Sequence, residues 1–118
     1  MIDKSTARLV KICILTLGLD KPVNVRIKSG EFFFSYEHGY NIHGYCQSGN
    51  DRHNIVVCKG CNFVDVLAHE FVHAWIYENH PNAAVHGRTF QRAAVSFRRA
   101  LRDWGIYCGP LYQKGVDV

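Results

Sequence analysis

The segment covering residues 62–79 constrains the fold of this chain more than any other feature. Its hydrophobic residues go nearly all the way around a helical wheel, so a helix formed here must be covered on most sides. Asn62 can cap this helix, Asp65 is placed like the acidic partner of a capping box, and the helix should end at about Asn79. We therefore expect a central core helix. Its apolar residues are Phe63, Val66, Leu67, Phe71, Val72, Trp75 and Ile76.

This helix carries the motif His69-Glu70-x-x-His73. A helix turns by about 100° per residue, which places His73 within about 40° of His69, one turn further along, so both imidazoles can reach one metal ion. Glu70 is rotated by about 100° from His69, where its carboxylate can take a proton from metal-activated water. If these side chains were ordinary residues of a buried helix, they would be polar groups buried without a compensating partner, which costs free energy. The motif predicts a site for one Zn²⁺ ion.

A third ligand could be His80 or His86. Glu78 lies about 140° around the helix from the second histidine and faces away. We expect a last helix over about residues 86–104, in which His86 begins the inward stripe, and Gly87 leaves room for close approach of the two helices. The other residues of that stripe are Phe90, Ala93, Phe97 and Trp104. This geometry favours His86 as the ligand and His80 as a solvent-exposed loop residue or a hydrogen-bond partner of a ligand.

Three histidine ligands leave the fourth tetrahedral position to water, which is typical of catalytic zinc rather than structural zinc. The ion would activate this water and polarise a carbonyl group, while Glu70 would accept the water's proton and pass it to the leaving amine. The pattern predicts hydrolysis of a peptide bond. Candidate donors to the oxyanion, by residue type, are Tyr40, Tyr45, His43 and His53.

The rest of the pattern predicts an α+β fold. A first helix should cover about residues 3–18, because Pro22 disfavours helix in the residue before it. Four short strands should follow and form a small antiparallel meander, with a tight turn at Ser29-Gly30 between the first two. The expected strands are residues 23–28, 31–36, 42–46 and 53–58. The tail residues expected to pack back onto the body are Ile106, Tyr107, Leu111 and Tyr112.

Length and composition set broader limits. The chain has 118 residues, of which 47% are hydrophobic, so we expect one folded domain. No apolar run approaches the roughly 20 residues that span a membrane, and Lys11 interrupts the stretch that most resembles a signal-peptide core. The five cysteines, an odd number, are expected to be reduced thiols in a cytoplasmic protein.

The stretches HEFVHAW, residues 69–75, and HGRTF, residues 86–90, together resemble the SprT-like metalloproteases. That family's pattern runs HExxHAW and then HGxxF on the next helix, and the upstream GYC and HNIVVC resemble its short strand pair. The resemblance covers roughly residues 42–100 and implies a minimal zincin-like fold for a single SprT-like domain over residues 1–118. It also implies zinc ligation by His69, His73 and His86, with Glu70 as catalytic base. Because the family includes Spartan-type proteases, it implies DNA-associated or DNA-crosslinked protein substrates.

The outer face of the expected last helix bears on contact with DNA. It displays five arginines on the side away from the zinc ligands, an arrangement that can meet a phosphate backbone. They are Arg88, Arg92, Arg98, Arg99 and Arg102. The alternative interpretation is a solvated helix face that happens to use arginine.

A single CxxC, Cys58 to Cys61, could contribute to a second metal site with Cys46 and either Cys108 or His53, but ordinary buried or half-exposed thiols are the favoured interpretation. Three functions therefore compete. The first is a zinc endopeptidase acting on DNA-associated proteins, and the second is a small HExxH protease that cleaves one regulatory protein without DNA. The third is a nucleic-acid-binding protein that retains zinc for stability.

Overall fold

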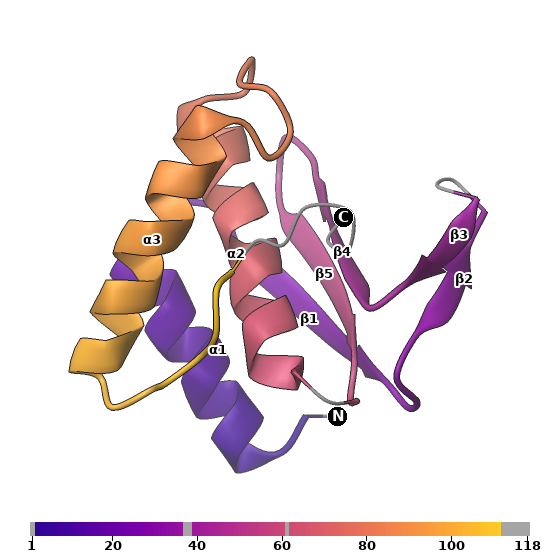
Figure 1. The fold of residues 1–118 in the computed structure, drawn as a ribbon. Helices are drawn as coiled ribbons and strands as arrows, with labels where there is room; N and C mark the ends of the chain where they lie inside the picture. Colours follow the sequence, from indigo (N-terminus) through magenta and orange to yellow (C-terminus); the bar gives the residue numbers. More distant parts are fainter. Residues whose placement is uncertain (1, 37–38, 61, 112–118) are drawn as a thin grey trace.

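The computed structural model describes residues 2–36, 39–60 and 62–111 of the chain. Within these residues the fold is α+β, with three helices and five short strands (Figure 1). The elements in chain order are α1 (Lys4–Leu17), β1 (Val23–Lys28), β2 (Phe33–Ser35), β3 (Tyr40–Ile42), β4 (Gly44–Ser48), β5 (His53–Cys58), α2 (Phe63–Asn79) and α3 (Arg88–Asp103).

Helix α2 is the centre of the molecule, as its apolar wheel predicts. The three-stranded sheet covers one side of α2, and α1 and α3 pack against the other (Figure 1). Eight residues of α2 are buried, and they occupy several sides of the helix. They are Leu67, Ala68, His69, Glu70, Phe71, Val72, Ala74 and Ile76.

Helix α1 lies within the predicted range of residues 3–18 and is capped at both ends. Asp3 caps the N-terminus by accepting a 2.7 Å hydrogen bond from the backbone N–H of Thr6. Gly18 ends the helix in the left-handed conformation, φ 64°, and its N–H returns to the carbonyl groups of Ile14 and Leu15. The start of α2 differs from its prediction. Asn62 makes no side-chain cap, and Asp65 instead accepts a 3.1 Å bond from the N–H of Gly109 in the C-terminal segment.

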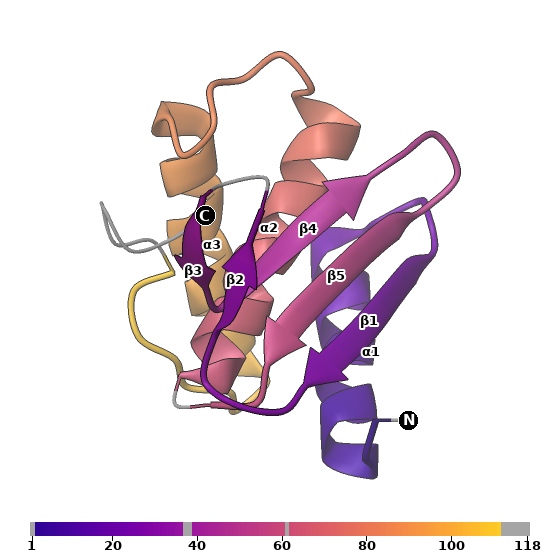
Figure 2. The same cartoon turned by 90° about the vertical axis from the view of Figure 1, so that its right-hand side faces the viewer.

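The predicted antiparallel meander is wrong. The main sheet has the order β1-β5-β4, in which β1 runs parallel to β5 and β4 runs antiparallel to it (Figure 2). Strand β5 is the central strand, and its residues Ile55, Val56, Val57 and Cys58 are all buried, so side chains on both of its faces are shielded from water.

The remaining pair, β2 and β3, forms a separate antiparallel hairpin that projects from the body (Figures 1 and 2). Ser29-Gly30 does not close a hairpin between β1 and β2. Instead, the N–H of Lys59 bonds to the carbonyl of Lys28 at 2.8 Å and continues the β1–β5 pairing. Gly60 packs so tightly here that an added Cβ would lie 2.7 Å from Cα of Glu31.

The C-terminal segment packs back onto the body only in part. Leu111 is buried and Ile106 packs against the core, but Tyr107 is 76% exposed, contrary to expectation. Tyr112 lies outside the described residues. Among the helices that the structure describes, none is long and apolar enough to cross a membrane.

Candidate metal centre and cleft

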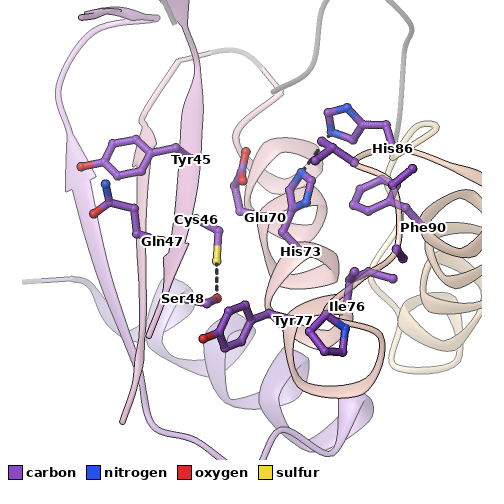
Figure 3. A pocket seen from close by; sticks show the side chains of 14 residues that line it. Tyr45, Cys46, Gln47, Ser48, Glu70, His73, Ile76, Tyr77, His86 and Phe90 are labelled. Carbon is purple, nitrogen blue, oxygen red and sulfur yellow. Dashed lines mark hydrogen bonds between the residues drawn. The ribbon is translucent and has the colours of Figure 1, made fainter. Parts of the chain in front are cut away.

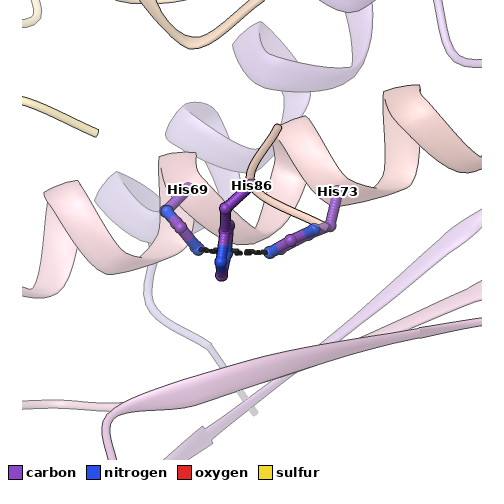
Figure 4. A group of neighbouring side chains, drawn as sticks. All are labelled: His69, His73 and His86. Atoms are coloured by element: carbon purple, nitrogen blue, oxygen red, sulfur yellow. Dashed lines mark hydrogen bonds between the residues drawn. The ribbon is translucent and has the colours of Figure 1, made fainter. Parts of the chain in front are cut away.

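Three imidazole rings converge at one point beside α2 (Figure 4). Nε2 of His73 lies 3.2 Å from Nε2 of His69 and 3.0 Å from Nε2 of His86, and the third edge of this triangle is 3.2 Å. His69 is buried, and the other two are half-buried. The three rings form a group that could hold a metal ion, and it is the one such His, Cys, Asp or Glu group among the described residues.

A hydrogen bond orients the ring of His69 and selects the tautomer of its neutral form. Its Nδ1 lies within hydrogen-bond distance of the carbonyl oxygen of Leu111. Because a carbonyl only accepts, Nδ1 must carry the hydrogen, and Nε2 of the neutral ring therefore presents a lone pair to the centre of the triangle. This is the arrangement by which outer partners orient histidine ligands in metal sites. The acceptor of the His69 hydrogen bond is a backbone carbonyl in the C-terminal segment, and no sequence motif predicts this contact.

His86 reaches the triangle from a loop rather than from a helix. Helix α3 begins at Arg88, and His86 lies two residues before it with φ 56°, in the left-handed region. The predicted helical stripe therefore begins at Phe90, not at His86, and it does not include Trp104, which follows the helix and is 47% exposed. The carbonyl of His86 accepts a 2.8 Å bond from Nε2 of Gln91, which fastens this residue to the first turn of α3.

Gly87 also acts differently from its prediction. A Cβ at this position would lie 3.1 Å from Cβ of Ala84, within the same loop, rather than against the neighbouring helix. The N–H of Gly87 bonds to the carbonyl of Ala84 at 3.0 Å. Gly87 thus permits the tight turn that presents the imidazole of His86.

Phe90 forms an apolar wall for the three imidazoles. Its ring is 1% exposed, and its centroid lies 5.0 Å, 4.6 Å and 4.9 Å from those of His69, His73 and His86. An aromatic wall excludes water from one side of the ligands and strengthens electrostatic interactions there.

Glu70 lies on the neighbouring position of α2, is 2% exposed and borders a cleft between α2 and β4 (Figure 3). The cleft has a volume of about 300 Å³ and also borders His73 and His86, so the carboxyl group and the imidazoles meet the same space. Its lining residues come from β4, α2, the loop before α3 and the first turn of α3.

Strand β4 forms the wall opposite α2. The side chain of Cys46 points toward α2, whereas the side chains of Tyr45 and Gln47 lie on the other face of the strand (Figure 3). Burial raises the pKa of the Cys46 thiol to about 12, and the negative charge of Glu70 adds to this effect, while a hydrogen bond from Ser48 opposes it. The thiol is therefore a neutral part of the wall.

The four residues proposed as oxyanion donors do not gather beside Glu70. Tyr40 is 52% exposed on the hairpin, and Nδ1 of His43 lies 2.7 Å from the carbonyl oxygen of Glu31. Tyr45 borders the cleft but directs its ring away from α2. His53 is completely buried and belongs to a separate hydrogen-bonded network.

The network around His53 joins three parts of the fold. Its Nδ1 lies 2.6 Å from Oγ of Ser48, and its Nε2 lies 2.6 Å from Oε2 of Glu78. Glu78 also accepts bonds from the backbone N–H groups of Asp20 and Lys21, at 2.8 Å and 3.2 Å. As predicted, Glu78 is not part of the histidine cluster. Local patterns do not predict this network, because its members lie far apart in the sequence.

His80 and the five arginines lie away from the metal centre. His80 is exposed and packs against Trp75, with ring centroids 5.4 Å apart. Four of the arginines on α3 are exposed, whereas Arg98 is half-buried and donates a 2.9 Å bond to the carbonyl of Cys108. Arg92 borders a groove toward α1 and α2, while Arg98, Arg99 and Arg102 border another groove toward the C-terminal segment.

The described cysteines Cys13, Cys46, Cys58 and Cys108 are free thiols. They form no second metal-binding group with other described residues. Cys61, the other half of the CxxC, lies outside the described residues.

No protein-family model, curated protein or solved structure matches this chain. Any assignment of function must therefore come from the residues and their arrangement.

Proposed function

We propose that this protein is a zinc-dependent endopeptidase of the SprT-like, zincin-like type, with His69, His73 and His86 as zinc ligands and Glu70 as general base. One observation carries the proposal. Three imidazole Nε2 atoms lie 3.0–3.2 Å from one another next to a buried glutamate that borders the same cleft.

The cluster fits zinc. Zinc bonds to imidazole nitrogen at roughly 2.0–2.1 Å, so a tetrahedral ion separates its ligand nitrogens by about 3.3–3.4 Å. The triangle of Nε2 atoms, with edges of 3.0–3.2 Å, is close to this size. Three imidazole ligands, with no further His, Cys, Asp or Glu ligand in the cluster among the described residues, are typical of catalytic rather than structural sites. When bound, zinc supplies the Lewis acidity that activates water and polarises the scissile carbonyl.

Each residue then has a defined task. Glu70 receives a proton from the attacking water and returns it to the leaving amine, a role that suits its place in the cleft. The Leu111 carbonyl holds His69 in the tautomer that leaves Nε2 open. Phe90 keeps solvent from the rings. A purely structural zinc would need no buried carboxyl group at the mouth of the site, which counts against a nucleic-acid-binding protein that retains zinc only for stability.

Strand β4 offers a place for the peptide substrate. It is an edge strand, bonded to β5 on one side, and no other strand of the described residues pairs with its second edge. Four consecutive residues of β4, Tyr45 to Ser48, border the cleft. An extended peptide could therefore add to this edge and present its scissile carbonyl between Glu70 and the imidazoles.

DNA-associated or DNA-crosslinked proteins are the proposed substrates. The support is the set of arginines on α3, together with the resemblance of the HEFVHAW and HGRTF stretches to a family that includes DNA-binding proteases. Single-stranded DNA added to a cleavage assay tests this part. Faster cleavage supports it, and cleavage that is indifferent to DNA favours a regulatory protease without a DNA function.

The variant Glu70→Gln tests the mechanism. It keeps the shape of the side chain but removes the base, so zinc content and thermal unfolding should match the parent while cleavage of an unfolded protein falls by at least about 100-fold. The matched control is Glu31→Gln, an exposed position, which should cleave normally. Equal cleavage by Glu70→Gln and the parent would show that the assigned base is wrong.

A further inference from the structure

The projecting β2–β3 hairpin carries exposed aromatic side chains on one face. Phe32, Phe34 and Tyr36 are 54%, 51% and 93% exposed. Phe34 lies on β2, with Phe32 just before the strand and Tyr36 just after it. Side chains two residues apart in extended chain lie on the same side, about 7 Å apart. The rings of Phe34 and Tyr36 lie edge to face, with centroids 5.1 Å apart, which confirms the shared side. We call these three side chains the aromatic ladder.

The ladder is not needed to hold the hairpin on the body, because the opposite face does so. Ile42 is 1% exposed, and the ring of Phe33 packs edge to face on Tyr45 with centroids 5.7 Å apart. Nζ of Lys28 lies 4.4 Å from the centre of the same Phe33 ring. One face of the hairpin is thus fixed while the other presents apolar area to water, a feature that marks interaction sites in folded proteins.

The hairpin is continuous with the wall of the cleft. Strand β3 ends at Ile42, and β4, which forms that wall, begins at Gly44. Tyr45 both borders the cleft and contacts Phe33 of the hairpin. A chain that leaves the cleft along β4 in the direction of Gly44 therefore meets the hairpin next (Figures 1 and 2).

The lack of positively charged side chains in the hairpin limits the kinds of partner that it can bind. The stretch from Glu31 to Tyr45 contains no lysine and no arginine, and Lys28 contacts Phe33 on the opposite face of the hairpin. The aromatic ladder itself therefore lacks the cations that a phosphate backbone or an anionic membrane surface requires. Aromatic rings without cations suit apolar side chains, and the spacing of the ladder matches alternate side chains of an extended polypeptide.

We propose that the aromatic ladder is a docking site for an extended apolar segment of the protein substrate, beyond the residues that occupy the cleft. This inference rests on the proposed endopeptidase function and names its substrate class, which is unfolded protein with apolar side chains at alternate positions. A folded protein buries such segments and would not engage the ladder. The hairpin thereby directs cleavage to unfolded chains.

The test uses the double variant Phe34→Ser/Tyr36→Ser. Its matched control is Leu15→Gln/Tyr107→Ser, which removes an apolar and an aromatic side chain that are 60% and 76% exposed away from the hairpin. Two substrates are compared, a short fluorogenic peptide that only fills the cleft and a reduced, carboxymethylated protein. The ladder variant should raise KM for the unfolded protein by about tenfold, because two apolar binding surfaces are removed, and leave kcat/KM for the short peptide unchanged.

Binding is measured separately from cleavage, in the Glu70→Gln background, by fluorescence anisotropy of the labelled unfolded protein. The ladder substitutions should weaken this binding by about tenfold whether or not the protein is a protease. The docking site and the endopeptidase activity can therefore be disproved separately. Equal binding by ladder variant and parent overturns the docking site, as does an equal decrease in the control. If the substitutions instead reduce binding of oligo-dT, the hairpin binds nucleic acid and the proposal is wrong. If they abolish self-association in sedimentation, the hairpin is an interface between copies of this chain and the proposal is also wrong.

Discussion

Nε2 of His86 lies 3.0 Å from Nε2 of His73, and His86 makes this contact from a left-handed backbone with φ 56°. Asparagine tolerates this conformation better than most residues but provides no imidazole. We expect His86→Asn to keep the fold, as measured by circular dichroism, and to lose metal, as measured by mass spectrometry of the metal content. Loss of an outer partner alone weakens metal binding by about 10- to 100-fold, so loss of a ligand should cost more.

His80→Asn is the matched control for this experiment. His80 is exposed, lies at the end of α2 and is not part of the histidine cluster. It should retain the full metal content of the parent. Loss of metal in His80→Asn, or full retention in His86→Asn, would show that the ligand set is wrong.

Glu78 should make stability depend on pH on the acid side. Burial alone would raise its pKa, but bonds from the N–H of Asp20, from His53 and from the N–H of Lys21 outweigh burial and lower the pKa below its usual value of 4.5. A lowered pKa means that the folded state favours the carboxylate. Its contribution is therefore present above pH 4.5 and is lost as the pH falls through the folded-state pKa.

The variant Glu78→Gln should accordingly be less stable at pH 7, by about 1–3 kcal/mol, since it weakens charge-assisted hydrogen bonds in a buried network. Urea unfolding in the presence of EDTA, between about pH 6 and pH 3, should show a shallower loss of stability than in the parent. The exposed substitution Glu31→Gln should reproduce the parental slope. Parallel curves for Glu78→Gln and the parent would contradict the assignment.

The thiols of Cys13 and Cys46 should be inert in the folded protein. Burial raises both pKa values to about 12, assisted by the nearby Cys108 in one case and by Glu70 in the other. Because only the thiolate reacts, about one molecule in ten thousand is reactive at pH 8 when the pKa is about 12. Iodoacetamide at pH 8 should label these positions only after denaturation, as read by peptide mass spectrometry. Rapid labelling of native Cys46 would contradict the closed wall of the cleft.

The double variant Arg92→Glu/Arg99→Glu tests the proposed binding of DNA. Both side chains are exposed on α3, and their replacement should weaken binding of single-stranded DNA in a fluorescence assay. For every phosphate that the variant no longer neutralises, the slope of log K against log salt should fall by about 0.7. The control Arg8→Glu/Arg26→Glu makes the same charge change at exposed positions on α1 and β1. Equal effects in both pairs would indicate net charge alone, without a site on α3.

Local sequence patterns predicted the elements whose form depends on near neighbours. The apolar wheel of residues 63–79 requires a covered helix whatever surrounds it, and α2 is the central helix of the fold. The spacing of His69 and His73 places both rings on one side of any helix, and the structure brings both to one point. The bounds of α1, Lys4–Leu17, agree with the helix predicted over about residues 3–18.

The pairing of the strands could not be read from the same patterns. Alternation in β1 and aromatic residues in β2 indicate strands, but they do not say which strand bonds to which. The order of the strands follows from how the core packs. Strand β5 has buried apolar residues on both faces and lies in the central position between β1 and β4. The hairpin of β2 and β3 remains a separate unit, which creates the aromatic ladder.

The candidate metal centre was likewise predictable from the sequence only in part. The sequence by itself determined the central helix, two imidazoles one turn apart and the glutamate between them, because a helix fixes the directions of its own side chains. Only the tertiary structure decided that His86 would arrive from a left-handed loop residue, that the Leu111 carbonyl would orient His69, and that β4 would close the cleft. These contacts join segments far apart in the chain, and their geometry is set by how the whole core packs rather than by any local repeat.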